Sequence, residues 1–157
     1  MSETFKQRRQ QIIEKMPNNS LAVFFASDLI RRSADATYDF SVNRNFYYLC
    51  NCDEDGLILF IVKTEHSTTE RLFIKDYNPT YEKWVGHSLK SEDANKQSGI
   101  ERIHTISEFD EVLAHTLERN PITSILIDAE RNSLNNREIE GEKFAKLIHK
   151  TYPAISV

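Results

Sequence analysis

Cysteine and glycine are both scarce in this chain of 157 residues, and each shortage excludes a class of protein. The two cysteines, Cys50 and Cys52, are too close for an easy disulfide and do not have the Cys-x-x-Cys redox spacing. We therefore expect two structural thiols, the alternative being a weak redox or metal-binding role. Four glycines cannot build a glycine-rich nucleotide-binding loop, and the phosphate-binding Gly-x-x-x-x-Gly-Lys-Ser/Thr motif is missing.

Long apolar runs and an excess of positive charge are missing too. An apolar run such as Leu57–Val62 is far too short to cross a bilayer, and the first nine residues lack the apolar centre of a secretory signal. The formal net charge is −4, and no basic stripe could follow a phosphate backbone. These observations predict a cytoplasmic protein that binds neither nucleic acid nor membrane.

Familiar catalytic motifs are also absent. The sequence has no Gly-x-Ser-x-Gly elbow, and its five histidines include no His-Glu-x-x-His pair. Residues 53–55 (Asp-Glu-Asp) resemble the start of a calcium loop, but Leu57 would occupy the third ligand position, so a solvated acidic turn is favoured. Asp35 and Asp39 could share a helical face, which by itself is weak evidence for acid–base chemistry.

Hydrophobic periodicity predicts alternating helices and strands. Strands are expected at 21–26, 57–62, 71–75, 100–106 and 122–127, with 57–62 central and a loose turn joining it to 71–75. Helices are expected at 5–16, 79–85, 92–97, 107–117 and 137–151. Ser107 and Asp110 resemble a capping box, and Phe144, Leu147 and Ile148 are expected to point inward. The alternation predicts an α/β fold, a mixed β-sheet flanked by helices.

The organisation of the chain is expected to be simple. No internal repeat, low-complexity tract or second domain is visible, and the length suits one domain, so residues 1–157 are predicted to form a single unit. The last residues, Tyr152–Val157, look like the start of another extended segment, which predicts that the polypeptide continues.

One stretch of sequence carries a specific resemblance. Residues 32–38 (Arg-Ser-Ala-Asp-Ala-Thr-Tyr) and the aromatic cluster at 46–49 (Phe-Tyr-Tyr-Leu) resemble the signature of the amino-terminal domain shared by aminopeptidase P, prolidase and creatinase. The segment 82–86 (Glu-Lys-Trp-Val-Gly) keeps the family's order and approximate spacing, and the similarity spans about residues 5–109. A Thr-Gly-Phe turn of many relatives is replaced by residues 50–52 (Cys-Asn-Cys), which leaves the aminopeptidase or dipeptidase branch open.

The resemblance implies the non-catalytic amino-terminal domain of a dimetal Xaa-Pro peptidase. The catalytic "pita-bread" domain, expected downstream, would hold two divalent metals, usually manganese, through Asp, His and Glu ligands. None of those ligands maps onto this chain, so we expect no metal site and no catalysis in the segment itself. The partners implied are the catalytic domain, short proline-containing peptides in the full enzyme, and further copies in a dimer or tetramer.

The same resemblance points to particular side chains. Trp84 and Asp35 match positions at the substrate cleft or a neighbouring subunit, and a flat indole suits the wall of a pocket that grips a proline ring. The alternatives are a core or helix-packing tryptophan and, for Asp35, a helix cap or local salt bridge. The residues expected to pack between domains are Arg32, Tyr38, Phe46, Tyr47 and Tyr48.

Two other functions remain open at this point. The first is a stand-alone peptide- or small-molecule-binding module on the same fold, which would use the aromatic face without catalysis. The second is a free-standing hydrolase that relies on Asp35 and Asp39. A reading frame that continues past Val157 into Asp, His and Glu ligands would favour the peptidase domain over both.

Overall fold

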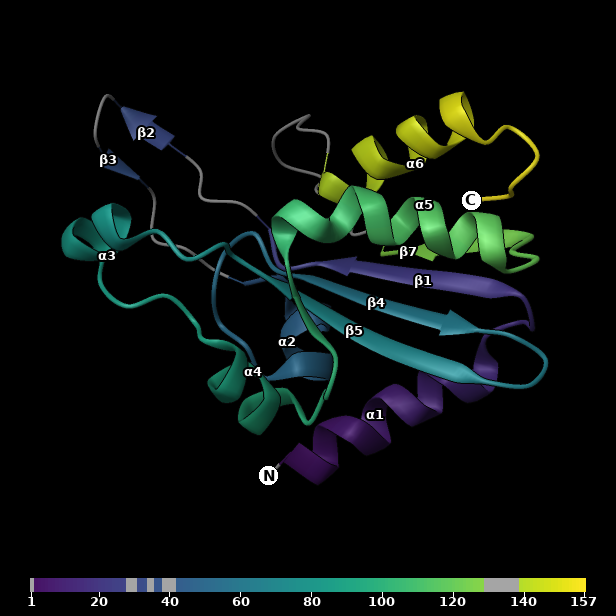
Figure 1. Cartoon of the computed structure of the whole chain (residues 1–157), viewed down its shortest axis with the longest axis horizontal. Helices are drawn as coiled ribbons and strands as arrows, with labels where there is room; N and C mark the ends of the chain where they lie inside the picture. Colours follow the sequence, from purple (N-terminus) through teal and green to yellow (C-terminus); the bar gives the residue numbers. More distant parts are fainter. Residues whose placement is uncertain (1, 28–30, 34–35, 38–41, 129–138) are drawn as a thin grey trace.

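The computed structural model describes residues 2–27, 31–33, 36–37, 42–128 and 139–157, which form a β-sheet between two layers of helices (Figure 1). The strands are β1 (Ser20–Phe25), β2 (Arg31–Ser33), β3 (Ala36–Thr37), β4 (Ile58–Lys63), β5 (Thr68–Ile74), β6 (Ile103–Thr105) and β7 (Ser124–Ile127). The helices are α1 (Ser2–Lys15), α2 (Arg44–Cys50), α3 (Pro79–Val85), α4 (Ser91–Ser98), α5 (Phe109–Arg119) and α6 (Glu140–Thr151), with the 3-10 turn η1 (Ile106–Glu108) before α5. The predicted α/β fold with a mixed sheet is confirmed.

Among the residues that the structure describes, the main sheet has five strands in the order β6-β5-β4-β1-β7. Strand β4 is antiparallel to both β1 and β5, whereas β7 is parallel to β1 and β6 is parallel to β5. Four strands therefore run in one direction, and their last residues meet at one end of the sheet, called here the carboxyl end. Both the β2–β3 hairpin, which follows β1, and helix α3, which follows β5, lie at this end (Figure 1).

Strand β4 shows why the layers form. Its alternate residues point to opposite faces of the sheet, and both faces are covered, so the strand is apolar from Ile58 to Val62. Leu59 and Ile61 pack in a core with α1, α2 and α4, while Phe60 and Val62 pack in a second core with α5 and α6. The helices of each core lie on their own side of the sheet (Figure 1).

The β4–β5 hairpin is tighter than expected. The sequence predicts a loose polar connection, but β5 already begins at Thr68, and only residues 64–67 form the turn. The Thr64 N–H donates to the Ser67 carbonyl at 2.8 Å, and the Ser67 N–H donates to Thr64 Oγ1 at 3.0 Å. The prediction was wrong because the first strand residues are polar and at most partly buried, so they carry no hydrophobic signal.

The start of helix α5 differs from the predicted capping box. The Ser107 backbone N–H and hydroxyl donate to Asp76 instead, at 3.2 and 2.5 Å. The reciprocal partners at this turn are Thr105 and Glu108, since a Glu108 oxygen accepts the Thr105 N–H at 2.7 Å. These bonds, the backbone bond foremost, lower the pKa of Glu108. A contact from the segment just after β5, distant in sequence, therefore engages Ser107, and Thr105 begins the 3-10 turn that precedes α5.

The inward face of α6 is narrower than predicted. Phe144 and Ile148 are buried, but Leu147 is 52% exposed. Helix α6 covers the β1–β7 side of the sheet, where the sheet ends, so only the stripe at positions i and i+4 reaches the core. Among the described residues, none of the helices has the length and apolar character that crossing a bilayer requires.

A buried arginine joins three of the helices. Arg9 is fully buried, and its Nη1 donates to the carbonyls of Leu49 and Ser98, both at 2.8 Å. These carbonyls belong to the last turns of α2 and α4, where a cation also interacts favourably with the helix dipole. The Nε atom forms an ion pair with Glu70 at 3.1 Å. One side chain of α1 therefore connects α2, α4 and β5.

The two cysteines belong to the core. Both side chains are buried and unpaired, and the Cys52 thiol donates to the Cys50 carbonyl at 3.4 Å. Burial raises the pKa of Cys52 to about 12 and that of Cys50 well above its ordinary value. The thiols are therefore protonated at neutral pH, which agrees with the structural role expected from the sequence.

Candidate functional site

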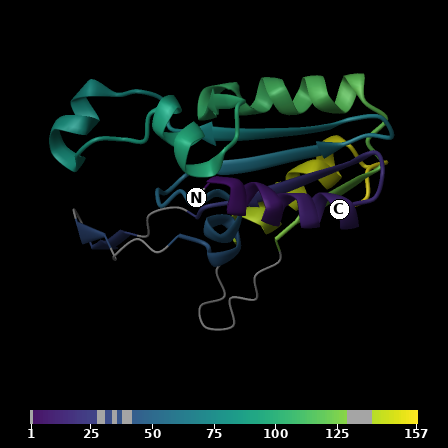
Figure 2. The same ribbon diagram turned by 90° about the horizontal axis from the view of Figure 1, so that it is seen from below.

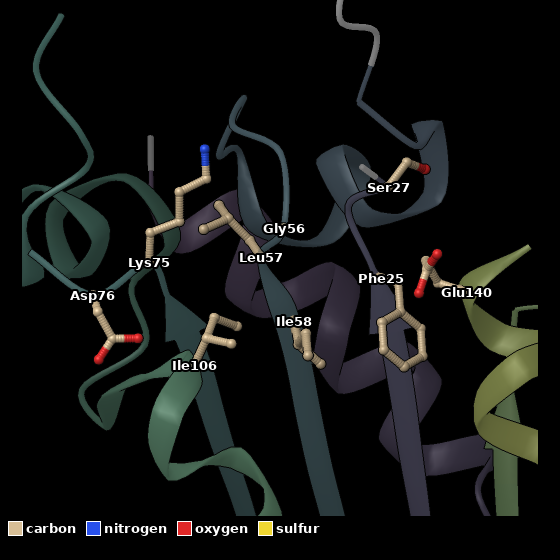
Figure 3. Close-up of a pocket in the computed structure, with 9 residues that line it drawn as sticks. All are labelled: Phe25, Ser27, Gly56, Leu57, Ile58, Lys75, Asp76, Ile106 and Glu140. Atoms are coloured by element: carbon tan, nitrogen blue, oxygen red, sulfur yellow. The ribbon is translucent and has the colours of Figure 1, made fainter. Parts of the chain in front are cut away.

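A pocket opens at the carboxyl end of the sheet, where ligands bind in many open α/β sheets (Figure 3). It has a volume of about 360 Å³ and is built by the ends of β1 and β5, the start of β4, η1 and the start of α6. The residues that line it are Phe25, Ser27, Gly56, Leu57, Ile58, Lys75, Asp76, Ile106 and Glu140. Figure 3 shows the apolar side chains between Lys75 and Asp76 on one side and Glu140 on the other.

Each of the three charged groups at this pocket has a partner within the chain. Lys75 forms an ion pair with Asp55, and Glu140 accepts a hydrogen bond from Lys143 at 2.7 Å. The hydrogen bonds from Ser107, the side-chain bond foremost, lower the pKa of Asp76. The pocket therefore combines an apolar floor with charges whose positions are fixed, as small-molecule sites usually do.

The acidic turn at 53–55 is not merely solvated, contrary to the sequence-based expectation. Asp55 holds Lys75, as described above, and Glu54 is partly buried. This burial raises the pKa of Glu54, although a hydrogen bond from the Leu89 backbone N–H works in the opposite direction. The turn thus connects the start of β4 to the end of β5 and to the segment before α4.

Helix α3 projects from the carboxyl end of the sheet and carries Trp84 (Figure 1). The Asn78 side chain accepts the N–H groups of Thr80 and Tyr81, both at 3.1 Å, and Pro79 occupies the first turn. Gly86 ends the helix at φ 95°, a conformation that residues with a Cβ rarely adopt. The local sequence thus defines both ends of a very short helix.

The aromatic side chains of this region are exposed. The exposed fraction is 69% for Tyr77, 41% for Tyr81 and 85% for Trp84, and we call these three residues the α3 aromatic group. The alternative interpretation of Trp84 as a core residue is therefore wrong. Three large exposed aromatics so close in sequence are typical of a surface that contacts a ligand or another protein surface.

Glu82 fixes the chain that follows the α3 aromatic group. One of its carboxylate oxygens accepts the Ser88 N–H at 3.2 Å and the Ser88 hydroxyl at 2.8 Å. The other oxygen lies 3.8 Å from His87 Nδ1. These interactions, the Ser88 hydroxyl bond foremost, lower the pKa of Glu82 below its ordinary 4.5. The carboxylate form of Glu82 therefore holds α3 against the next segment.

Replacing Glu82 by glutamine is expected to loosen the end of α3, since the amide binds Ser88 more weakly than a carboxylate does. Trp84 is the only tryptophan, so its fluorescence anisotropy reports on this helix alone. We expect lower anisotropy in Glu82→Gln at neutral pH. In the unaltered protein the same decrease should begin only as the pH falls below 4.5, because a lowered pKa means that the contribution disappears on acidification. Glu92→Gln, on α4, is the control, and equal anisotropy in all three proteins would contradict this role.

The predicted packing residues on α2 divide into buried and exposed ones. Phe46 is buried in the core, whereas Tyr47 and Tyr48 are 42% and 50% exposed. The Arg8 guanidinium lies 4.1 Å from the centre of the Tyr48 ring and donates to the Tyr48 carbonyl at 3.1 Å. One of the two exposed tyrosines therefore already has a partner within the chain, from α1.

The structure separates the predicted site residues into two regions. Arg32 lies in strand β2, in the hairpin at the carboxyl end, while Asp35, Tyr38 and Asp39 lie outside the described residues. Figure 2 shows this hairpin and α3 at the same end of the molecule but on opposite sides of it. Tyr47 and Tyr48 sit on α2, within the layer of helices on one face of the sheet.

The described residues do not fit a two-metal site. Such a centre, as the family resemblance implies, needs several carboxylate and histidine ligands close together. In the part of the chain that the structure describes, no group of three or more His, Cys, Asp or Glu side chains could hold a metal ion.

Several site residues escaped the sequence analysis. Lys75, Asp76 and Glu140 are isolated in the sequence, and only the topology of the sheet places them around one pocket. The position of Lys75 and Asp76 was a usable signal, because both directly follow a strongly predicted strand and therefore lie at the end of the sheet. Tyr77 and Tyr81 could have been recognised as exposed, since Tyr77 precedes and Tyr81 lies in a short proline-initiated helix with few apolar residues.

Comparison with known proteins identifies relatives of this chain in sequence and in fold. The family described as "Aminopeptidase P, N-terminal domain" matches residues 5–126. The Xaa-Pro aminopeptidase of Haemophilus influenzae is 32% identical over 116 residues, which cover 74% of this chain and 27% of that protein. The chain therefore spans only about a quarter of the length of this curated relative.

Solved structures agree with the fold. A Bacillus anthracis protein named as a candidate aminopeptidase P has a TM-score of 0.93 and 32% identity, covering 99% of this chain and 37% of that one. Aminopeptidase P from Escherichia coli with the inhibitor Pro-Leu has a TM-score of 0.79 and 24% identity, covering 96% of this chain and 33% of that one. The E. coli enzyme has also been solved in a zinc-substituted form with product.

Proposed function

Because this chain belongs to the aminopeptidase P N-terminal domain family, we propose that it is the non-catalytic domain of an Xaa-Pro aminopeptidase and shapes the entrance to that enzyme's active site. The relatives named above are peptidases, and this chain covers only their amino-terminal part. The aminopeptidase branch is favoured over the dipeptidase branch because the matching relatives carry the aminopeptidase name.

The observation that carries the proposal is the exposure of Trp84. A tryptophan that is 85% exposed leaves a large apolar surface in water, which is unfavourable unless another surface covers it. Helix α3, which carries this side chain, projects from the sheet and has defined ends. The Glu-Lys-Trp-Val-Gly surroundings of Trp84 are those in which the family resemblance implies an indole at the substrate cleft. The proposed role is a wall that contacts the proline ring of a short peptide.

The remaining parts of the proposal concern the rest of the enzyme. Its catalytic domain would hold the divalent metals, manganese being the metal we propose, and the E. coli relative, which has a zinc-substituted form, supports a metal-dependent reaction. Short peptides with proline in the second position are the proposed substrates, which the names of the relatives support. We further propose a cytoplasmic homo-oligomer, a dimer or tetramer, in which Arg32 and Tyr47 pack between domains; Phe46, which the sequence also suggested for this role, is instead buried in the core of this domain.

The experiment that tests the cleft role replaces Trp84 by alanine in the full enzyme. We expect kcat/KM for an Xaa-Pro peptide to fall by about ten- to a hundredfold, since a large contact residue is lost while the fold is not. Trp84→Phe should recover part of the loss because it restores an aromatic face. Lys83→Ala, at the neighbouring exposed position, should leave kcat/KM unchanged. Unchanged kinetics in Trp84→Ala would refute the cleft role.

One observation favours the alternative, a stand-alone binding module. The carboxyl-end pocket of about 360 Å³ has an apolar floor and could hold a small molecule without a catalytic domain. The two functions are separated by titrating the chain with an Xaa-Pro dipeptide in the absence of any catalytic domain. Saturable binding that Ile106→Glu, at a partly buried lining residue, abolishes supports the module, while binding only in the full enzyme supports the proposed domain role.

A further inference from the structure

A second pocket lies between helix α5 and the β5–β6 side of the sheet, with a volume of about 230 Å³. Its polar lining includes Arg71, His104, His115, Arg119 and Asn120. None of these residues belongs to the carboxyl-end pocket or to the α3 aromatic group. Helix α5 begins at the carboxyl end and runs along the sheet toward the opposite end, where Arg119 lies in its last turn (Figure 1).

The fold explains why these side chains converge. Arg71 is two residues before Phe73 in β5, so both side chains point to the face that α5 covers. His104 is paired with Phe73 across the sheet and stacks on its ring, with the centroids 5.3 Å apart. On α5, His115 and Arg119 are four residues apart and occupy successive turns of one side of the helix.

The pocket is basic although the whole chain carries a net charge of −4. No carboxylate is among the described residues that line it, and neither Arg71, His115 nor Arg119 forms an ion pair with any described residue. Burial and, second, repulsion by Arg102 lower the pKa of Arg71. His104 alone has an acidic neighbour, Glu108, at 3.5 Å. A partly buried guanidinium without a counter-ion is costly, and a bound anion would offset that cost.

We propose that this pocket binds a small phosphate-type oxyanion, either inorganic phosphate or the phosphate group of a small metabolite. The guanidinium groups of Arg71 and Arg119 come from different layers, the sheet and the helix, so they can donate to different oxygens of one tetrahedral anion. The ring nitrogens of His104 and His115 add donors, and together these groups supply more hydrogen bonds than one carboxylate accepts. The site is separate from peptide cleavage and does not depend on the proposed function.

The test is a titration of the protein with sodium phosphate at constant ionic strength. Binding is measured by calorimetry and by the shifts of the histidine ring signals in NMR spectra. We expect saturable binding, with no response to sodium chloride at matched ionic strength. Arg71→Gln and Arg119→Gln should each weaken the affinity about tenfold, which corresponds to about 1.4 kcal/mol. Lys96→Gln, an equal charge change on α4, should bind phosphate as the unaltered protein does.

The ligand source is resolved with glycerol 3-phosphate as a second probe. Tighter binding of this ester assigns the site to an organic phosphate, and equal or weaker binding assigns it to inorganic phosphate; either result supports an oxyanion site. The proposal is overturned if phosphate gives no saturable response, or if Arg119→Gln binds as tightly as the unaltered protein. Arg119 is exposed, so this variant remains informative even if Arg71→Gln fails to fold.

Discussion

Replacing Arg9 by alanine is expected to lower the free energy of unfolding by about 3–5 kcal/mol, a large part of the stability of a domain of this size. The variant removes the donor that joins the Leu49 and Ser98 carbonyls and the cation that faces Glu70. The buried carbonyls at the ends of α2 and α4 then lose their hydrogen-bond donor, and the partly buried Glu70 carboxylate loses its counter-charge. Urea unfolding monitored by circular dichroism measures the change.

The control for Arg9 is the residue beside it. Arg8 has the same side chain on the same helix but lies on the surface, where it packs on Tyr48 and donates to the Tyr48 carbonyl. Arg8→Ala should cost about 1 kcal/mol or less. If both arginine variants lowered stability equally, the buried network would not be what joins α1, α2 and α4.

Replacing Phe73 by alanine should also cost about 3–5 kcal/mol, because the lost ring leaves a cavity where the sheet meets α5. Phe73 is fully buried, and its ring contacts those of Phe60 and Phe109 edge to face at 5.8 and 5.1 Å, with His104 stacked on it. Thermal and urea unfolding measure the loss. Because the ring also supports His104, this variant should loosen the basic pocket as well.

Two matched variants show whether the ring itself matters. Phe73→Leu keeps most of the volume and should cost about 1.5 kcal/mol or less. Tyr77→Ala removes an aromatic ring that is 69% exposed and should change stability by about 0.5 kcal/mol or less. A cost for Phe73→Ala as small as that for Phe73→Leu would mean that the core collapses into the space and that the aromatic contacts contribute little.

Much of the fold could be predicted from hydrophobic periodicity. The run at 57–62 was expected to be a central strand, and it became β4 with both faces buried, shifted by one residue. The stripe of α5 and the glycine that ends α4 were also found, because these signals lie within a few residues of each other. The errors arose where a residue distant in sequence determines the local structure. For example, Asp76 binds Ser107 and thereby changes where the turn before α5 begins.

The candidate site was less predictable than the fold. Trp84 was identified through its resemblance to a family pattern, and its 85% exposure excludes a core position. Its neighbours around the carboxyl-end pocket were not identified, since Lys75 and Glu140 are 65 positions apart and neither has a motif. The basic pocket was missed for the same reason: Arg71 and Arg119 look like ordinary surface charges in the sequence.

By itself, the sequence determined the α/β class, the central strand and the family, because each rests on local spacing of apolar residues or on a short motif. Only the tertiary structure decided that Arg9 is buried while its neighbour Arg8 is partly exposed, and that Leu147 faces solvent. Burial depends on what packs against a side chain, and a periodic pattern cannot show where a sheet ends or which helix ends meet. Both pockets likewise exist only because strand order places distant residues side by side.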